Sequence, residues 1–248
     1  MSTTNVGQAV PPAQAGPTQD RPEACPTQDR PAACPTRGLF VSFEGGDGCG
    51  KSTQMRLLAA RLLSEGRRVL ETTEPGGTRI GAQIRRILLD SANQDLSPAA
   101  ELLLYFASRA QNVEELILPA LADGVIVLTD RFTDSTLAYQ GFGRGLGERV
   151  VAELDRIACN GLRPDLTLLI DVDLDAALAR TRQRNLDLSE SRMDEQAVEF
   201  HHRVREAYLE LAAREPERFR VIDGRGDAGA VAEAVWRAVA PALEKLRV

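Results

Sequence analysis

The chain has 248 residues, of which 43% are hydrophobic and 27% are charged, and its formal net charge is −6. This composition is typical of a globular protein with a sizeable core, and the acidic balance argues against a protein that coats nucleic acid. No apolar run approaches the roughly 18 residues of a membrane helix, and the N-terminus lacks the pattern of a secretion signal. We therefore expect a cytoplasmic protein with neither nucleic acid nor a membrane as its partner.

The first 37 residues differ from the rest of the chain. PTQDRPEAC at 17–25 is followed at once by the near-copy PTQDRPAAC at 26–34, and the segment is rich in proline without apolar periodicity. Such a segment cannot bury enough apolar surface to offset the entropy of ordering it. We predict a disordered tail over residues 1–37. Cys25 and Cys34 recur with the repeat, which duplication explains, and a metal or redox role is the alternative.

From Gly38 onward, short apolar runs alternate with segments whose apolar residues recur at helical spacing. Several runs are continuously apolar, as in strands covered by helices on both faces. The pattern predicts an α/β domain over residues 38–248, a doubly wound parallel sheet of about five strands with helices on both faces. Strands are expected at GLFVSFEG (38–45), RVLETTEP (68–75), GVIVLTDRF (124–132), PDLTLLIDV (164–172) and FRVIDG (219–224), and helices at residues 52–66, 78–90, 97–124, 134–141, 147–161, 173–185, 196–214 and 229–246.

The stretch EGGDGCGKST (44–53) joins the first strand to the first helix, and it contains the phosphate-loop (P-loop) pattern Gly45-x4-Gly50-Lys51-Ser52 in its required context. Glycines let backbone N–H groups approach phosphate oxygens, and the helix N-terminus adds positive charge. Lys51 would reach the β- and γ-phosphates of a nucleoside triphosphate, and Ser52 would bind Mg²⁺. The alternative is a glycine-rich turn without a ligand. The predicted nucleotide-binding residues are Gly45, Gly46, Asp47, Gly48, Cys49, Gly50, Lys51, Ser52 and Thr53.

Two further pairs of residues narrow the reaction. Asp130 and Arg131 close the third strand, at the sheet edge that faces the ligand crevice. The acid could hold magnesium through its waters and the arginine could grip a phosphate, although a surface salt bridge is the alternative. Tyr105 and Arg109 lie four apart in a long helix, where they could stack on a base and bond its edge. A core tyrosine beside a snorkelling arginine is the alternative.

Arginines gather around the polar stretch NLDLSESRMDE between two predicted helices. A solvated charged face is the common reason for such a cluster. Beside a P-loop, the alternative is a lid that closes over the transferring phosphoryl group. The arginines are Arg180, Arg182, Arg184 and Arg192.

From about Gly38 to the C-terminus the sequence resembles the thymidylate kinase (dTMP kinase) family of bacterial type. FVSFEGGDGCGKSTQ is similar to the phosphate loop of the family. The order and spacing of five further stretches also agree with its signatures, which together are far more specific than the loop alone. They are EPGGTRIGAQIRRILLD, AELLLYFASRAQNVEELILPAL, DRFTDSTLAYQGFGRGL, RPDLTLLIDV and RVREAYLELA.

The resemblance implies transfer of the γ-phosphoryl group of ATP to dTMP, giving dTDP in dTTP biosynthesis, with Mg²⁺ as cofactor. Asp47 would contact the 3′-hydroxyl, Tyr105 would stack on thymine, Arg109 would bond the base edge, and Arg131 would hold the dTMP phosphate. The thymine pocket would include Thr136 and Gln140, and Tyr139 would crowd the 2′ position. Implied catalytic residues are Lys51, Asp47, Arg131, Arg184 and Arg192, and implied metal residues are Ser52 and Asp130.

The resemblance also implies a lid at about residues 183–194, carrying Arg182, Arg184 and Arg192, and a homodimer that forms through the long helix. One position departs from the family, which commonly reads T-R-E-P-G-G-T where this chain has Thr73 in place of the arginine. Arg79, Arg85 or Arg86 could compensate, and we expect Arg85 to do so.

Three other functions fit a P-loop domain. A GTPase switch would need an N-K-x-D type stretch, which this sequence lacks. A nucleotide-dependent binding module would not need the acceptor residues Tyr105, Arg109 and Tyr139. A kinase for another nucleoside monophosphate is the closest alternative, because it would share the scaffold.

Overall fold

The computed structural model describes residues 38–177, 193 and 196–246. The predicted tail at 1–37, with Cys25 and Cys34, lies outside these residues, as do Arg180, Arg182, Arg184 and Arg192. Within the described part of the chain, no helix is long and apolar enough to span a membrane.

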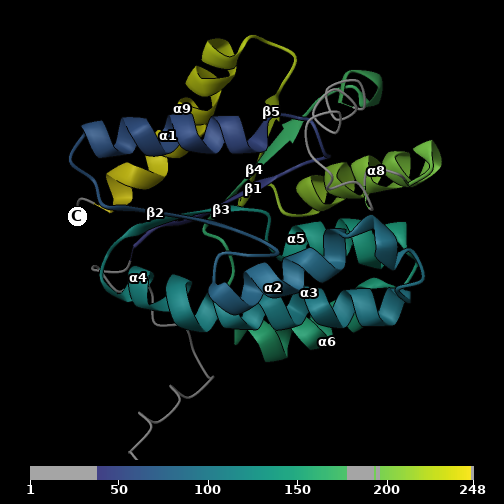
Figure 1. The fold of residues 1–248 in the computed structure, drawn as a ribbon. Helices are drawn as coiled ribbons and strands as arrows, with labels where there is room; N and C mark the ends of the chain where they lie inside the picture. Colours follow the sequence, from purple (N-terminus) through teal and green to yellow (C-terminus); the bar gives the residue numbers. More distant parts are fainter. Residues whose placement is uncertain (1–37, 178–192, 194–195, 247–248) are drawn as a thin grey trace, which may run out of the picture. The chain divides into compact units, whose positions relative to one another are not determined.

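Five parallel strands form one sheet in the order β2-β3-β1-β4-β5 (Figure 1). The sheet confirms the predicted doubly wound α/β class. The chain fills the β2 side of β1 first and then crosses to the β4 side, so the strand order reverses at β1, and a crevice opens at such a point beyond the carboxyl ends of the strands. The strands are β1 (Phe40–Glu44), β2 (Val69–Thr73), β3 (Ile126–Asp130), β4 (Leu166–Asp171) and β5 (Phe219–Asp223).

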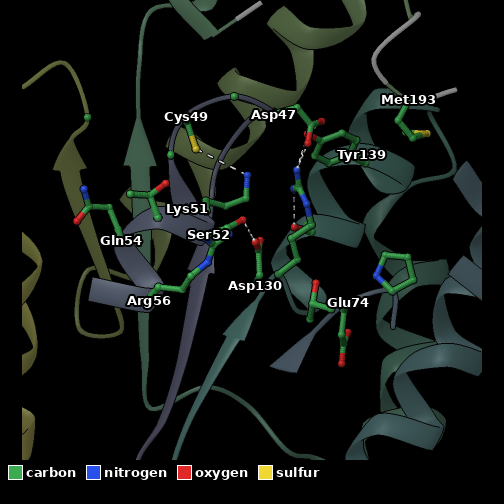
Figure 2. A pocket seen from close by; sticks show the side chains of 18 of the residues that line it. Asp47, Cys49, Lys51, Ser52, Gln54, Arg56, Glu74, Asp130, Tyr139 and Met193 are labelled. Carbon is green, nitrogen blue, oxygen red and sulfur yellow. Dashed lines mark hydrogen bonds and ion pairs between the residues drawn. The ribbon is translucent and has the colours of Figure 1, made fainter. Parts of the chain in front are cut away.

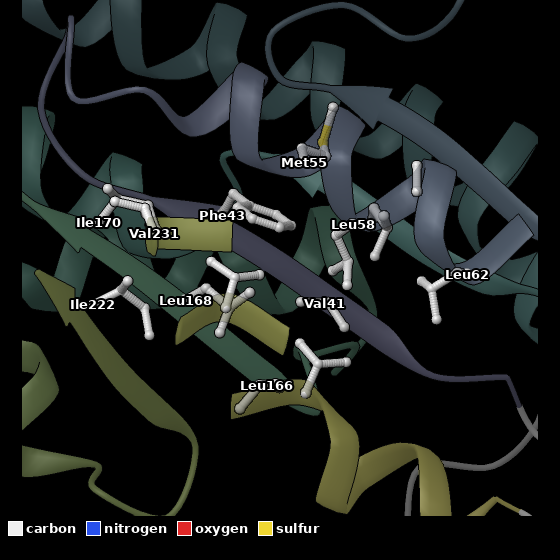
Figure 3. Packing of buried hydrophobic residues seen from close by; sticks show 14 of the residues in the cluster. Val41, Phe43, Met55, Leu58, Leu62, Leu166, Leu168, Ile170, Ile222 and Val231 are labelled. Carbon is white, nitrogen blue, oxygen red and sulfur yellow. The ribbon is translucent and has the colours of Figure 1, made fainter. Parts of the chain in front are cut away.

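One face of the sheet is covered by α1 (Lys51–Ser64) and α9 (Ala228–Lys245). Alternate residues of β1 and β4 point into this layer, where Phe43 and Leu168 meet Leu58 and Val231 (Figure 3). The buried layer fixes the start of α1, and so the position of the P-loop, against the sheet.

The other face carries the remaining helices. Phe40, Val127 and Leu169 point into this layer, so the central strands are buried on both faces, as their continuous apolar runs predict. Its elements are α2 (Arg79–Leu89), the short 3₁₀ turn η1 (Ser91–Asn93), α3 (Pro98–Asn112), α4 (Leu118–Ala122), α5 (Thr133–Thr136), α6 (Glu148–Cys159) and α8 (Val198–Arg214).

Two predicted helices contain π-helical segments. The long helix predicted at 97–124 runs as α3, then as the π-helical η2 (Val113–Ile117), then as α4. Pro119 stands just after η2, and its ring and missing N–H are incompatible with a regular turn there. The helix predicted at 134–141 similarly continues beyond α5 as the π-helical η3 (Leu137–Gly143). The helix predicted at 173–185 is described only at residues 174–177.

Candidate active site

A cleft of about 810 Å³ opens beyond the carboxyl ends of the strands (Figure 2). Its walls come from the P-loop, the loop after β2, helix α3, the end of β3 and η3. Predicted site residues from all these elements therefore meet in one cavity. They are Asp47, Gly48, Cys49, Gly50, Lys51, Ser52, Thr53, Tyr105, Arg109, Asp130, Arg131, Thr136, Tyr139 and Gln140.

The P-loop has the backbone that its glycines predict. Gly45 adopts a φ of 135°, and a Cβ there would lie 2.5 Å from the carbonyl oxygen of Ile170. Lys51 opens α1 and folds back over the loop, where its Nζ donates to the carbonyls of Gly45 (3.0 Å) and Gly46 (2.8 Å). The ammonium is thereby held inside the ring of backbone groups.

Ser52 and Asp130 point toward each other beside the P-loop (Figure 2). The Ser52 hydroxyl donates to Asp130 Oδ2 at 2.6 Å. These two predicted metal residues belong to different elements, α1 and β3. Together they place a hydroxyl and a carboxylate, the oxygen donors that Mg²⁺ prefers, at one point of the cleft.

Asp47, Arg131 and Tyr139 form a hydrogen-bonded cluster opposite Lys51. Arg131 Nη2 donates to Asp47 Oδ1 at 2.6 Å, and the Tyr139 hydroxyl donates to Asp47 Oδ2 at 2.8 Å. Burial opposes ionisation of Asp47, but the charges of Arg131 and Lys51 outweigh it and hold the pKa of this carboxyl below its ordinary value. Asp47 therefore stays charged and locks the guanidinium at the cleft wall.

Arg131 is positioned indirectly by the buried carboxyl group of Glu44, a residue that the sequence pattern had not indicated. Its backbone has a φ of 75°, and the next N–H, of Phe132, donates to Glu44 Oε1 at 2.7 Å. Ser135 and Tyr208 donate to Glu44 Oε2 at 2.5 and 3.1 Å, and both hydroxyls also accept from Arg131 Nη1. An acidic residue closing a continuous apolar strand was the available signal for Glu44.

Arg109 is almost completely buried, with 1% of its surface exposed. Its Nε pairs with Glu74, and its Nη2 donates to the Phe132 carbonyl (3.1 Å) and to Thr136 Oγ1 (2.9 Å). Asn112 donates to the second oxygen of Glu74 at 3.1 Å. Within the described residues, Arg109 Nη1 is buried without a hydrogen-bond partner, although the residue lines the cleft.

The three arginines considered as substitutes for the family arginine at Thr73 differ in position. Arg85 lines the cleft together with Thr73, and its Nη1 donates to the Pro75 carbonyl at 2.9 Å. Arg79 and Arg86 lie outside the cleft wall. The phase of α2 therefore places Arg85, and neither Arg79 nor Arg86, in the cleft wall, and compensation by Arg85 stays a prediction.

A P-loop at the strand-order reversal of a parallel sheet, in one cleft with the aromatic side chains of Tyr105 and Tyr139 and with Arg109 and Arg131, defines a P-loop nucleotide kinase. Comparison with known proteins narrows the class. A sequence model of the family described as "Thymidylate kinase" matches residues 43–235. The chain belongs to the thymidylate kinase family, and it phosphorylates dTMP to dTDP with ATP as the phosphoryl donor.

Similar proteins align with this chain over nearly their whole length. The thymidylate kinase of Trichlorobacter lovleyi is 52% identical over 81% of this chain and 96% of its own. That of Geobacter sulfurreducens is 50% identical over 80% and 94%. The crystal structure of thymidylate kinase from Ehrlichia chaffeensis matches with a TM-score of 0.68 and 33% identity, covering 82% of this chain and 99% of that one. The alternatives of a GTPase, a binding module and another nucleotide kinase are thereby wrong.

Proposed function

We propose that the P-loop end of the cleft binds ATP and that the recess between α3, η3 and the loop after β2 binds dTMP. The P-loop supplies backbone N–H groups and the Lys51 ammonium, which suit the β- and γ-phosphates. Asp47, Arg131 and Tyr139 line the same cleft as the P-loop and Arg109. Arg131 is then placed to hold the acceptor phosphate, Asp47 to meet the sugar 3′-hydroxyl, and Tyr139 to crowd a 2′-hydroxyl.

The transfer needs positioning and charge more than covalent help from the protein. An oxygen of the dTMP phosphate attacks the γ-phosphorus of ATP in line, and the bond to the ADP oxygen breaks. Lys51 and Arg131 neutralise charge on the two sides of this path. Arg184 and Arg192 are predicted to add charge from the lid, outside the described residues.

The residues at the P-loop also fit a magnesium ion. Ser52 Oγ and Asp130 Oδ2 meet at 2.6 Å beside the phosphates' expected position. We propose that Ser52 would bind the ion directly and that Asp130 would hold its waters. Bound Mg²⁺ would offset the negative charge of the ATP phosphates.

One observation supports the base site above the others. Arg109 Nη1 is a charged donor, and leaving such a group buried and unpaired costs free energy. A base carbonyl in the recess would satisfy it, and O4 of thymine is such an acceptor. Tyr105, one helical turn away, would cover the face of the ring.

The test is an ADP-release assay over dTMP, dUMP, UMP, CMP, AMP and GMP, run on the wild type and on Arg109→Lys. The lysine keeps a cation beside Glu74 but removes Nη1. We expect dTMP to be preferred and the variant to raise the KM for dTMP about tenfold or more, with the KM for ATP unchanged. An unchanged KM for dTMP in the folded variant would contradict the assignment.

We further propose a homodimer. Helices α2, α3 and α6, side by side on one face of the sheet (Figure 1), each present apolar side chains to the outside. Exposed apolar side chains on neighbouring helices are a common feature of protein interfaces. Its residues are Ile80, Ile87, Leu103, Val150 and Ile157.

A further inference from the structure

We propose that Glu101 is a specificity-determining residue that acts through Gln140. Held by Arg144, it fixes the Gln140 amide so that the monophosphate site accepts a base with an N3–H group and rejects cytosine. The inference rests on the proposed position of the base beside Arg109 and Gln140.

Glu101 is fixed from two elements. It lies in the first turn of α3 with 1% of its surface exposed. Arg144, just after η3, donates through Nε to Glu101 Oε1 and through Nη2 to Oε2, both at 3.2 Å. Arg144 also donates to Gln196 Oε1 at 2.7 Å and lies 4.9 Å from the Phe200 ring centroid. The arginine and the carboxylate therefore have little freedom to move.

The carboxylate determines which way round the Gln140 amide sits. An ionised carboxylate can only accept hydrogen bonds, so Gln140 must turn its NH₂ group toward it. Gln140 Nε2 donates to Glu101 Oε1 at 2.9 Å. The amide oxygen then points the other way. Gln140 lines the cleft, and its Oε1 takes part in no hydrogen bond within the described part of the chain.

The wall of the recess thus offers a fixed pattern to a base edge. Arg109 Nη1 can only donate, and the constrained Oε1 of Gln140 can only accept. Thymine and uracil carry an O4 acceptor beside an N3–H donor, so they match both groups. Cytosine carries an amino group beside an unprotonated N3, so it meets a donor with a donor and an acceptor with an acceptor. Two buried mismatches would strongly disfavour cytosine relative to thymine and uracil.

A neutral side chain at position 101 would remove the constraint. In Glu101→Gln the new amide can either accept from Gln140 or donate to it. Gln140 can then rotate and offer its NH₂ group to N3 of cytosine. A purely structural role for Glu101 predicts a different result, because looser packing would lower kcat/KM for dTMP and for dCMP alike.

The experiment measures kcat/KM for dTMP and dCMP with ATP held saturating. We expect Glu101→Gln to lower the dTMP/dCMP ratio of kcat/KM about tenfold or more, with the KM for ATP unchanged. In a Gln140→Met background the same substitution should leave the ratio unaltered. Glu148→Gln is the matched control, because Arg214 also holds Glu148 through both oxygens, at 3.0 and 2.8 Å, and Glu148 lies outside the cleft.

The outcomes separate the two proposals. A wild type that accepts dTMP and dCMP equally would overturn the proposed base site itself. A discriminating wild type whose ratio survives Glu101→Gln, or changes equally in the Gln140→Met background, would overturn only the role of Glu101. Should Glu101→Gln fail to fold, Glu101→Met also removes the acceptor-only carboxylate that orients Gln140, and the same fall in the ratio is expected.

Discussion

Glu44 is the buried residue that joins the groups around Arg131. It receives hydrogen bonds from Ser42, Phe132, Ser135 and Tyr208, which come from three different parts of the fold. Burial raises its pKa to about 7, Asp134 adds to the shift, and hydrogen bonds from Ser135 and Ser42 and the charge of Arg131 oppose it. Burial disfavours the charged form of this carboxyl group, and hydrogen bonds to it favour that form. Its pKa therefore differs between the folded and unfolded states, which links its protonation to the free energy of unfolding.

The pH dependence of unfolding tests this linkage. The native pKa of Glu44 lies above its ordinary value of 4.5, so the native state binds an extra proton between those values. The Glu44 contribution to stability is therefore fully present below about pH 4.5 and is lost as the pH rises through 7. Urea unfolding at pH 5 to 8 should show a decline of about 1–3 kcal/mol from this group.

Glu44→Gln should flatten that part of the curve, because an amide does not titrate. The exposed Glu71 on β2 provides the control, and Glu71→Gln should leave the wild-type slope in place. If Glu44→Gln and the wild type lose stability in parallel over this range, the linkage to Glu44 is wrong.

Arg85 is predicted to supply the charge that Thr73 lacks. A Cβ added at Gly76 would lie 3.1 Å from Thr73 Cγ2 and 3.8 Å from Arg85 Cδ, so both side chains flank one point of the cleft wall. We predict that Arg85→Ala raises the KM for dTMP or lowers kcat, by about tenfold for one lost charge-assisted bond. Adding Thr73→Arg should partly restore the activity.

Steady-state kinetics of both single variants and the double variant measure the compensation. Arg86→Ala is the matched control, because Arg86 follows in the same helix outside the cleft wall. If Arg85→Ala is silent while Thr73→Arg alone improves kcat/KM tenfold, the site lacks a charge and Arg85 does not supply it.

At the scale of elements, the loop after β2 is pressed against α3. Asn112 on α3 accepts from Thr72 at 2.9 Å through its amide oxygen and donates to Glu74 through its nitrogen. Gly77 lies against this contact with a φ of 76°. The loop can therefore hold Glu74, and through it Arg109, only while position 77 has no side chain.

Gly77→Ala should be strongly destabilising. Its Cβ would lie 2.4 Å from Thr72 Oγ1 and 2.6 Å from Asn112 Oδ1. Gly66 has the same φ of 76° with nothing within 4 Å of an added Cβ, so Gly66→Ala isolates the backbone strain. We expect about 1 kcal/mol from Gly66→Ala and at least about 2 kcal/mol more from Gly77→Ala. Equal losses on denaturant unfolding would show that the contact adjusts freely.

At the scale of the whole molecule, the proposed dimer depends on exposed leucines and isoleucines. Leu103 on α3 is 56% exposed and Ile157 on α6 is 71% exposed. Burying them against a second copy would remove apolar surface from water on both subunits. The predicted interface is thus the long helix together with its two neighbours.

Leu103→Glu should turn the dimer into a monomer, because two carboxylates would be buried at the interface. Leu63 on α1 is 55% exposed and lies on the opposite face of the sheet. Leu63→Glu should therefore leave the molecular mass of the dimer in solution unchanged. Size-exclusion chromatography with light scattering measures both. A wild type that is monomeric at micromolar concentration, or a Leu103→Glu variant that stays dimeric, would contradict the interface.

The amino-acid sequence alone was enough to predict the strand and helix order, the P-loop and the family. These are local properties, because apolar periodicity and glycine spacing act within a few neighbouring residues. The groups that support the site became visible only once the chain was folded. Tyr208 reaches Glu44 across 164 positions, and Gln140 reaches Glu101 across 39. Such contacts depend on which strands lie adjacent and on the phase of each helix, which also placed Arg85, rather than Arg79 or Arg86, in the wall of the cleft.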